Sequence, residues 1–133
     1  MDNEQTTIVL DGKKITSLKS FYSQIEKQMT KNLSWKIGRN LDAFNDVLRG
    51  GFGAFEYNEP IKLIWTHSNY SRAKLSWPET TKYIASKLKR CHPTNINSIK
   101  ADLDLAENQK GQTIFDLIVD IIKTHEHIEL HLD

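Results

Sequence analysis

A chain of 133 residues is long enough for one domain that closes its own hydrophobic core without a metal or a disulfide. Hydrophobic residues make up 38% and charged residues 26%, the net charge is +1, and no apolar run reaches the length of a membrane span. The single cysteine, Cys91, excludes an internal disulfide, and the acidic N-terminus is unlike a signal peptide. We therefore expect a cytoplasmic protein that makes no membrane contact.

The first half of the chain predicts one strand and two helices. A β-branched run over residues 6–10 is typical of a strand, and Asp11-Gly12 ends it with a turn. Apolar residues then recur at helical spacing from Ser17, the expected N-cap, to about residue 31. After a loop, Asn40 caps a second helix that ends at Gly50-Gly51, where a left-handed cap costs least.

The second half predicts two more strands with helices between them, because period-two and helical patterns alternate along it. The predicted elements are a strand at 61–65, helices at 68–75 and 80–89, a loop at 91–100, a helix at 114–123 and a strand at 128–132. Strands separated by helices imply parallel pairing, since each crossover helix returns the chain in the same direction. We therefore expect an α/β fold with a three-stranded parallel sheet covered by helices, its last strand at an edge.

The helix after Asn40 carries the pattern with the clearest functional content. Asp42, Asn45, Asp46 and Arg49 form a polar stripe opposite its apolar side. The simplest interpretation is a solvated face, with Asp42 complementing the helix dipole. Asp46 lies beyond the first turn, where the dipole gives a carboxylate little benefit, so the stripe is also a candidate binding surface.

Residues 38–48, reading Gly-Arg-Asn-Leu-Asp-Ala-Phe-Asn-Asp-Val-Leu, resemble the second-helix signature of the barstar family. Residues 60–65 resemble the second strand of that family, including its terminal Trp, and residues 114–133 align with its last helix and strand. The resemblance covers most of the chain outside residues 77–107, which have no counterpart in a minimal member. It implies a single barstar-like domain over residues 1–133 with a helical insertion at 77–107.

The resemblance implies a protein that inhibits a ribonuclease or nuclease toxin as an immunity protein or antitoxin, and not an enzyme. By position, Asp46 corresponds to the central inhibitory aspartate and Asp42 to the supporting one, both taking the place of RNA phosphates in the active site. Carboxylates mimic phosphate oxygens in bidentate pairing with Arg. We expect a monomer in a 1:1 complex, with no cofactor, metal or bound nucleic acid. The expected partner-binding residues are Asp46, Asp42, Asn45, Arg39, Trp35, Lys36, Arg49, Asn108 and Gln112.

The chain departs from the family pattern around this acidic centre. Asn45, Lys36 and Gly51 stand at positions that are aromatic in the family. On the last helix, the two positions that are often acidic align with Asn108 and Gln112. The acidic centre is kept while its rim has changed, which predicts a different target enzyme rather than a different mode of action.

A basic segment overlaps the insertion, because residues 72–100 hold seven Lys and Arg against one acid. Lys82, Lys87, Lys89 and Arg90 form a solvated helix face in the simplest interpretation. A sharper interpretation is a second contact surface for an acidic patch on the toxin, or for RNA. Two alternatives to an inhibitor therefore stay open: a regulatory interaction module with the same fold, and an RNA-binding module that uses the insertion.

The C-terminal histidines are a weaker candidate for a site. His125, His127 and His131 stand among Glu126 and Glu129 and resemble a metal cluster, although a polar face on an edge strand is the simpler interpretation. The paired acids of the second helix have no His or electrophilic partner beside them, so a catalytic role is not expected.

Overall fold

Three parallel strands form the sheet of the computed structural model, which describes residues 5–133. Met1 to Glu4, on which the expectation of no signal peptide depends, lie outside the described residues. The strands are β1 (Thr6–Asp11), β2 (Ile61–Thr66) and β3 (Ile128–Leu132), in the order β1-β2-β3. Both pairings are parallel, and β3 lies at a sheet edge as its alternating sequence predicts.

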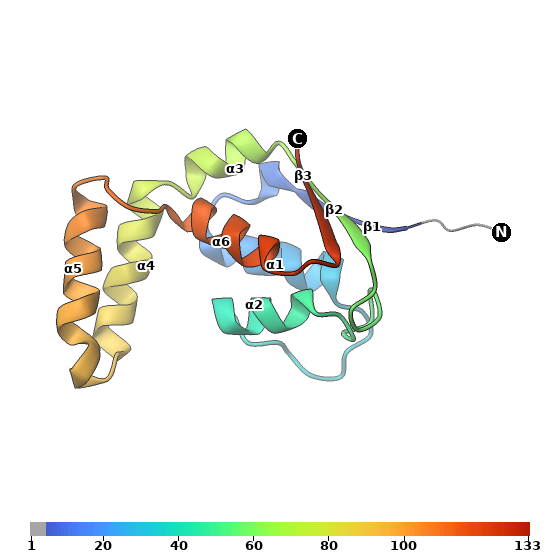
Figure 1. Cartoon of the computed structure of the whole chain (residues 1–133), viewed down its shortest axis with the longest axis horizontal. Helices are drawn as coiled ribbons and strands as arrows, with labels where there is room; N and C mark the ends of the chain where they lie inside the picture. Colours follow the sequence, from blue (N-terminus) through green and yellow to red (C-terminus); the bar gives the residue numbers. More distant parts are fainter. Residues whose placement is uncertain (1–4) are drawn as a thin grey trace.

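Helices cover one face of this sheet. The helices of residues 5–133 are α1 (Leu18–Met29), α2 (Leu41–Leu48), α3 (Ser68–Lys74), α4 (Trp77–Arg90), α5 (Ile96–Glu107) and α6 (Ile114–Lys123), with short 3-10 turns η1 (Gly12–Lys14) and η2 (Pro93–Asn95), and α1, α2 and α6 are the ones that cover the sheet. Figure 1 shows α1, α2 and α6 beside the sheet, with α4 and α5 side by side at the far end. No helix within residues 5–133 has the length and apolar character needed to cross a bilayer.

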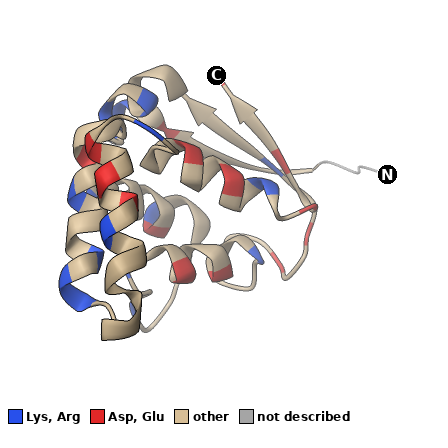
Figure 2. Cartoon of the chain, turned by 60° about the vertical axis from the view of Figure 1, so that its left-hand side comes forward, with Lys and Arg blue, Asp and Glu red and all other residues tan. Residues whose placement is uncertain are grey.

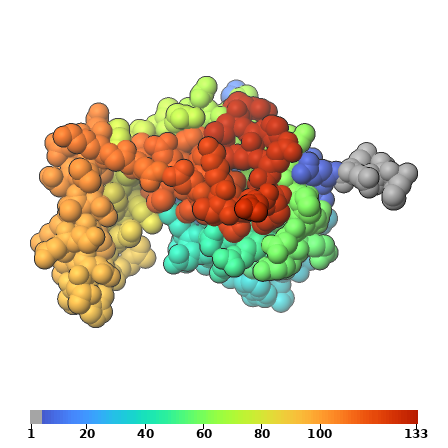
Figure 3. Space-filling view, in the orientation of Figure 1, coloured from blue at the N-terminus to red at the C-terminus, as the bar shows by residue number. Residues whose placement is uncertain are grey.

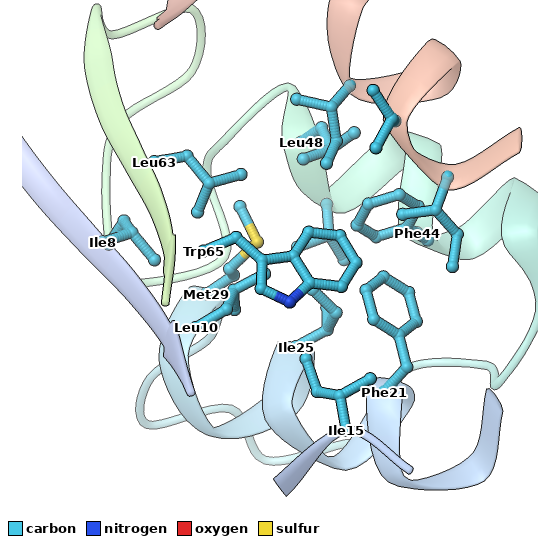
Figure 4. Packing of buried hydrophobic residues seen from close by; sticks show 14 of the residues in the cluster. Ile8, Leu10, Ile15, Phe21, Ile25, Met29, Phe44, Leu48, Leu63 and Trp65 are labelled. Carbon is cyan, nitrogen blue, oxygen red and sulfur yellow. The ribbon is translucent and has the colours of Figure 1, made fainter. Parts of the chain in front are cut away.

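The core lies between the sheet and α1, α2 and α6. The inward residues of β2, Ile61, Leu63 and Trp65, are fully buried, while the alternating residues on the other face are partly exposed. Trp65 packs between Phe21 of α1 and Phe115 of α6, with ring centroids 5.9 Å and 5.0 Å away. Figure 4 shows Trp65 beside Phe21. The period-two pattern of the strand therefore positions one large aromatic against both neighbouring helices.

The boundaries of the acidic helix follow from its caps, as the sequence predicts. The side chain of Asn40 accepts a hydrogen bond from the backbone N–H of Ala43 at 2.7 Å, which satisfies one of the free donors of the first turn. Gly50 and Gly51 follow the last turn with φ angles of +92° and +90°, which favour glycine. These two ends fix α2 at eight residues.

The loop predicted over residues 91–100 is wrong, because α5 begins at Ile96. The apolar residues of α5 are widely spaced. Ile99 and Ala106 are buried against α4, while Asn97 and Ser98 lie on the exposed first turn. Because the first turn of α5 is polar, the helical spacing of its apolar residues is not recognisable in the sequence. The segment predicted as a helical insertion is thus a pair of antiparallel helices that projects from the body of the molecule (Figures 1 and 3).

The base of this helix pair is tied to the rest of the domain by two side chains of α4. The Glu79 carboxylate accepts a hydrogen bond from the backbone N–H of Leu18, at the start of α1, at 2.7 Å. The buried Thr80 hydroxyl accepts one from the N–H of Ile114, at the start of α6, at 2.9 Å. Each side chain satisfies a free donor at a helix N-terminus, so α4 caps two helices of the core.

We expect Thr80→Val to lower the free energy of unfolding by about 1–3 kcal/mol, because it leaves the buried Ile114 N–H without an acceptor. Urea denaturation monitored by circular dichroism measures the loss. Thr81→Val is the matched control, since the Thr81 hydroxyl bonds only to the Pro78 carbonyl on an exposed surface. Equal stability of the two variants would contradict the assigned role of Thr80.

Candidate functional site

The polar stripe predicted on α2 is exposed in the structure. Asp42 and Asp46 lie on the outer surface of the helix, and Phe44, Val47 and Leu48 are buried beneath it. Successive acids at i and i+4 lie one above the other on the same helix face. Figure 2 shows the acidic positions of α2 next to those of α6, the neighbouring helix. The stripe is therefore part of a broader acidic surface.

Neither acid of α2 has an ion-pair partner within residues 5–133, where the salt bridges are Arg39–Glu26 and His131–Glu129. Two like charges at i and i+4 destabilise a helix by a few tenths of a kcal/mol. Asp46 also lies in the last turn, where the negative end of the helix dipole disfavours a carboxylate. The fold gains nothing from Asp46, which leaves its charge free for a partner.

Asn45 is half-buried and engaged within the domain, which makes it a different kind of residue from its two exposed acidic neighbours. Its side-chain oxygen lies 2.7 Å from Nε2 of His125, in the connection between α6 and β3. The ring of His127 makes a second contact to α2, with Nε2 2.7 Å from the carbonyl oxygen of Leu48. These two histidines join the C-terminal half of α2 to the opposite end of the chain.

Arg39 is also engaged within the domain. Its guanidinium pairs with Glu26 of α1, with Nε 3.0 Å from the carboxylate, and its Nη1 bonds to Ser23 and to the carbonyl oxygen of Lys19. The side chain therefore fixes the loop before α2 to α1. Arg39 is therefore not an unpaired charge that could act beside Asp46.

The aromatic part of the rim is supplied by two loops. Trp35 is 55% exposed, and its ring packs edge-on against Phe52 with the centroids 6.0 Å apart. A backbone hydrogen bond from Lys31 N–H to the Phe52 carbonyl holds the two loops together at 2.9 Å. Lys36 follows in the same loop and is exposed. Phe52 was not among the predicted binding residues, although it stands next to Gly51 at the expected aromatic position.

The placement of Asn108 and Gln112 on the last helix is wrong. Asn108 is the C-cap of α5, where its side-chain amide donates to the carbonyl of Asp104 at 2.8 Å, and Gln112 lies in the loop before α6. The error follows from the unforeseen α5, since α6 begins only at Ile114. The exposed acid on α6 is Asp120, whose carboxylate accepts a hydrogen bond from Gln112. Its place in the polar stripe of α6 was the signal that could have identified it.

Arg49 lies at the C-terminal end of α2, on the far side of Asp46 from Asp42. It lines a shallow cleft of about 570 Å³ together with Asn45, Tyr57 and His125. Partial burial lowers the pKa of His125 below its ordinary value, and the neighbouring His127 and Arg49 add to this shift. Burial is the largest of the three causes.

We expect acid to weaken the fold through His125. Because its pKa in the folded chain lies below the unfolded value of about 6.5, its contribution is complete above that pH. The contribution is lost as the pH falls through the lower folded-state pKa. Urea denaturation at pH 8, 6.5 and 5 should show a smaller acid loss in His125→Gln, which keeps a donor for Asn45 but takes up no proton.

His67→Asn, which removes an exposed histidine at the start of α3, is the control for this measurement. An acid loss in His125→Gln as large as in the unchanged chain would contradict the assignment to His125.

The C-terminal histidines make contacts within the domain. His127 contacts α2, and His131 bonds to Glu129 on β3. Within residues 5–133 no group of three or more His, Cys, Asp or Glu side chains is arranged to hold a metal ion.

The fold and the surface of α2 together define an α/β domain with an acidic helix whose carboxylates form no ion pair within residues 5–133. A family model described as Barstar (barnase inhibitor) matches residues 5–91, from β1 through α4. The chain belongs to the barstar family, a family of ribonuclease inhibitors rather than enzymes. The matched range contains the acidic helix and ends at Cys91, before α5, α6 and β3. Among curated proteins, no match to this chain is found.

Proposed function

We propose that this chain inhibits a ribonuclease by covering its active site with the acidic surface of α2. Asp46 is the central contact, and Asp42, one helical turn earlier, is the supporting one. The observation that carries the proposal is that both carboxylates are exposed and unpaired within residues 5–133, at a position where Asp46 costs the helix stability. Membership of the barstar family supplies the class of partner.

The chemistry of the contact is recognition of cations that otherwise bind RNA phosphates. A ribonuclease active site concentrates cationic groups, and Arg forms bidentate hydrogen bonds to carboxylates as it does to phosphates. Asp120 of α6 extends the negative surface, with Gln112 holding its carboxylate. Exposed Trp35 packs against half-buried Phe52 beside this surface, and aromatic side chains are enriched among the residues that contribute most to binding energy. Asn45 acts within the domain by fixing α2.

We further propose that the chain is the immunity protein or antitoxin of a nuclease toxin. It would act in the cytoplasm as a monomer in a 1:1 complex. The changed rim points to an enzyme other than the usual targets of the family, since Asn45 faces His125 and a lysine follows Trp35.

The test is suppression of ribonuclease toxicity in growing cells. The chain is co-expressed with barnase and with a panel of nuclease toxins, and growth is scored against cells that lack the chain. We expect rescue from one enzyme of the panel, and stoichiometric inhibition of that purified enzyme in an RNA-cleavage assay. Rescue that persists when Asp42 and Asp46 are both replaced by alanine would contradict the proposed mode of inhibition.

A further inference from the structure

A second recognition surface lies in a cleft between α4 and the N-terminal ends of α1 and α2. The cleft has a volume of about 690 Å³ and opens beside Asp42. Its floor is formed by the apolar and aromatic side chains of Leu18, Tyr22, Leu41 and Tyr83. Because α4 is tied to α1 and α6 at its base, the cleft is a fixed part of the fold.

The α4 wall of this cleft is cationic. It presents Lys82, Lys87 and Arg90, and none of the three forms a salt bridge within residues 5–133. The Lys87 ammonium lies 5.5 Å from the centre of the Tyr83 ring, and Arg90 bonds only to Ser86 in the preceding turn. The opposite wall carries the carboxylate of Asp42, which has no ion pair within residues 5–133, together with Lys19 and with Arg39, whose charge is paired with Glu26.

This arrangement sets a condition on the partner. A purely cationic enzyme seated on Asp42 would come within the reach of the α4 charges, since screening in physiological salt extends over about 8 Å. It would be repelled there unless it carried negative charge at that point. Like-charge contacts of this kind exclude wrong partners as effectively as attractive contacts select right ones.

We propose that the α4 cleft binds an acidic, aromatic-bearing segment of the same ribonuclease whose active site is covered by α2. This inference rests on the proposed function, and it identifies the segment of the partner enzyme that determines specificity. Carboxylates of the segment pair with Lys82, Lys87 and Arg90, and an apolar or aromatic side chain packs on the apolar lining of the cleft. The insertion thereby selects one enzyme among those with similar active sites.

The cleft fits a protein segment better than it fits RNA. Tyr22 is buried and Tyr83 is partly buried, so neither offers an open ring face on which successive bases could stack. The carboxylate of Asp42 would repel a phosphate backbone that runs along α4. A polypeptide carries both signs of charge and can match both walls.

The first experiment uses the free chain and a defined probe. An acetylated peptide, Glu-Asp-Tyr-Asp-Glu, is titrated into the isotope-labelled protein and followed by NMR. We expect salt-sensitive shifts at Tyr83 and Lys87, and binding at least about tenfold weaker in the double variant Lys82→Glu, Lys87→Glu. The matched control is Lys89→Glu with Lys100→Glu, an equal charge change at two exposed lysines outside the cleft.

Two outcomes of this titration would overturn the proposal. One is equal binding of the peptide to the two double variants, or shifts confined to residues outside the cleft. The other is binding of a uridine-rich RNA oligonucleotide through Lys82 and Lys87 under conditions in which the peptide does not bind. That second result would identify a nucleic-acid surface.

The second experiment uses the ribonuclease that the unchanged chain suppresses. We expect the Lys82→Glu, Lys87→Glu variant to bind it at least about tenfold more weakly than the control double variant. Equal or tighter binding overturns the cleft proposal while a loss in Asp46→Ala leaves the proposed function standing. Full inhibition by both Asp46→Ala and the cleft variant would instead refute the proposed function.

Discussion

Asp46→Ala is expected to weaken binding of the target ribonuclease by at least about 2 kcal/mol, or roughly 30-fold in Kd. The barnase–barstar complex is itself a standard example of such central charge pairs, so this magnitude is inherited from the family and is not an independent result. The physical reason is that removal of the carboxylate leaves the cations of the enzyme buried without a partner. Titration calorimetry or inhibition of RNA cleavage measures the loss.

Asp46→Ala should not lower the free energy of unfolding, so its loss of binding can be distinguished from a loss of folding. Asp46 is exposed, has no salt bridge within residues 5–133 and lies one turn from a like charge. Its removal is therefore expected to leave the free energy of unfolding unchanged or to raise it by up to about 0.5 kcal/mol. Asp104→Ala, an equal charge change on α5, is the control for binding. An equal effect of the two variants on Kd would contradict the assignment of α2 as the inhibitory helix.

Trp65→Ala is expected to lower the free energy of unfolding by about 3–5 kcal/mol, a large share of the stability of a small domain. Trp65 has no exposed surface and lies at the end of the central strand between Phe21 and Phe115. Its indole N–H donates to the buried hydroxyl of Ser71 at 2.9 Å, and that hydroxyl donates to the carbonyl of Gly12. The substitution opens a cavity and breaks this buried chain of hydrogen bonds.

Trp65→Phe separates the two contributions. It keeps an aromatic ring between the helices but removes the donor to Ser71, so its loss of stability should be smaller than that of Trp65→Ala and larger than zero. Urea denaturation monitored by circular dichroism gives both values. A loss below about 1 kcal/mol for Trp65→Ala would show that the core does not depend on this residue.

Most elements of the fold could be predicted because their local signals agree. Strand β2 is a short, mainly apolar run after Pro60, and α6 begins at a Thr113 capping box. Helix α5 could not be predicted, since polar residues interrupt the helical spacing of its apolar residues and its start follows Pro93 and Asn95. Local sequence patterns indicate where a helix or strand begins and ends. They are weak for a helix such as α5, which buries few residues because it packs against one neighbour, α4.

Some features of the candidate site could likewise be predicted from the sequence, and others could not. The exposure of Asp42 and Asp46 follows from helical periodicity and could be predicted, whereas the contact of Asn45 with His125 joins residues 80 positions apart. No pattern within either segment indicates that contact. The same is true of Arg39, whose charge is taken up by Glu26 of α1. Sequence identifies which charges a surface can present, and only the tertiary structure shows which of them are already paired.

The histidine contacts on α2 have a kinetic consequence. Because His125 and His127 already hold Asn45 and the end of the helix in place, little backbone order remains to be gained when a partner arrives. Association should then be limited by diffusion and orientation, with a rate constant that falls steeply as salt is added, instead of by a slow rearrangement. The free and bound forms of α2 should superimpose, and selection among enzymes should appear mainly in the lifetime of the complex.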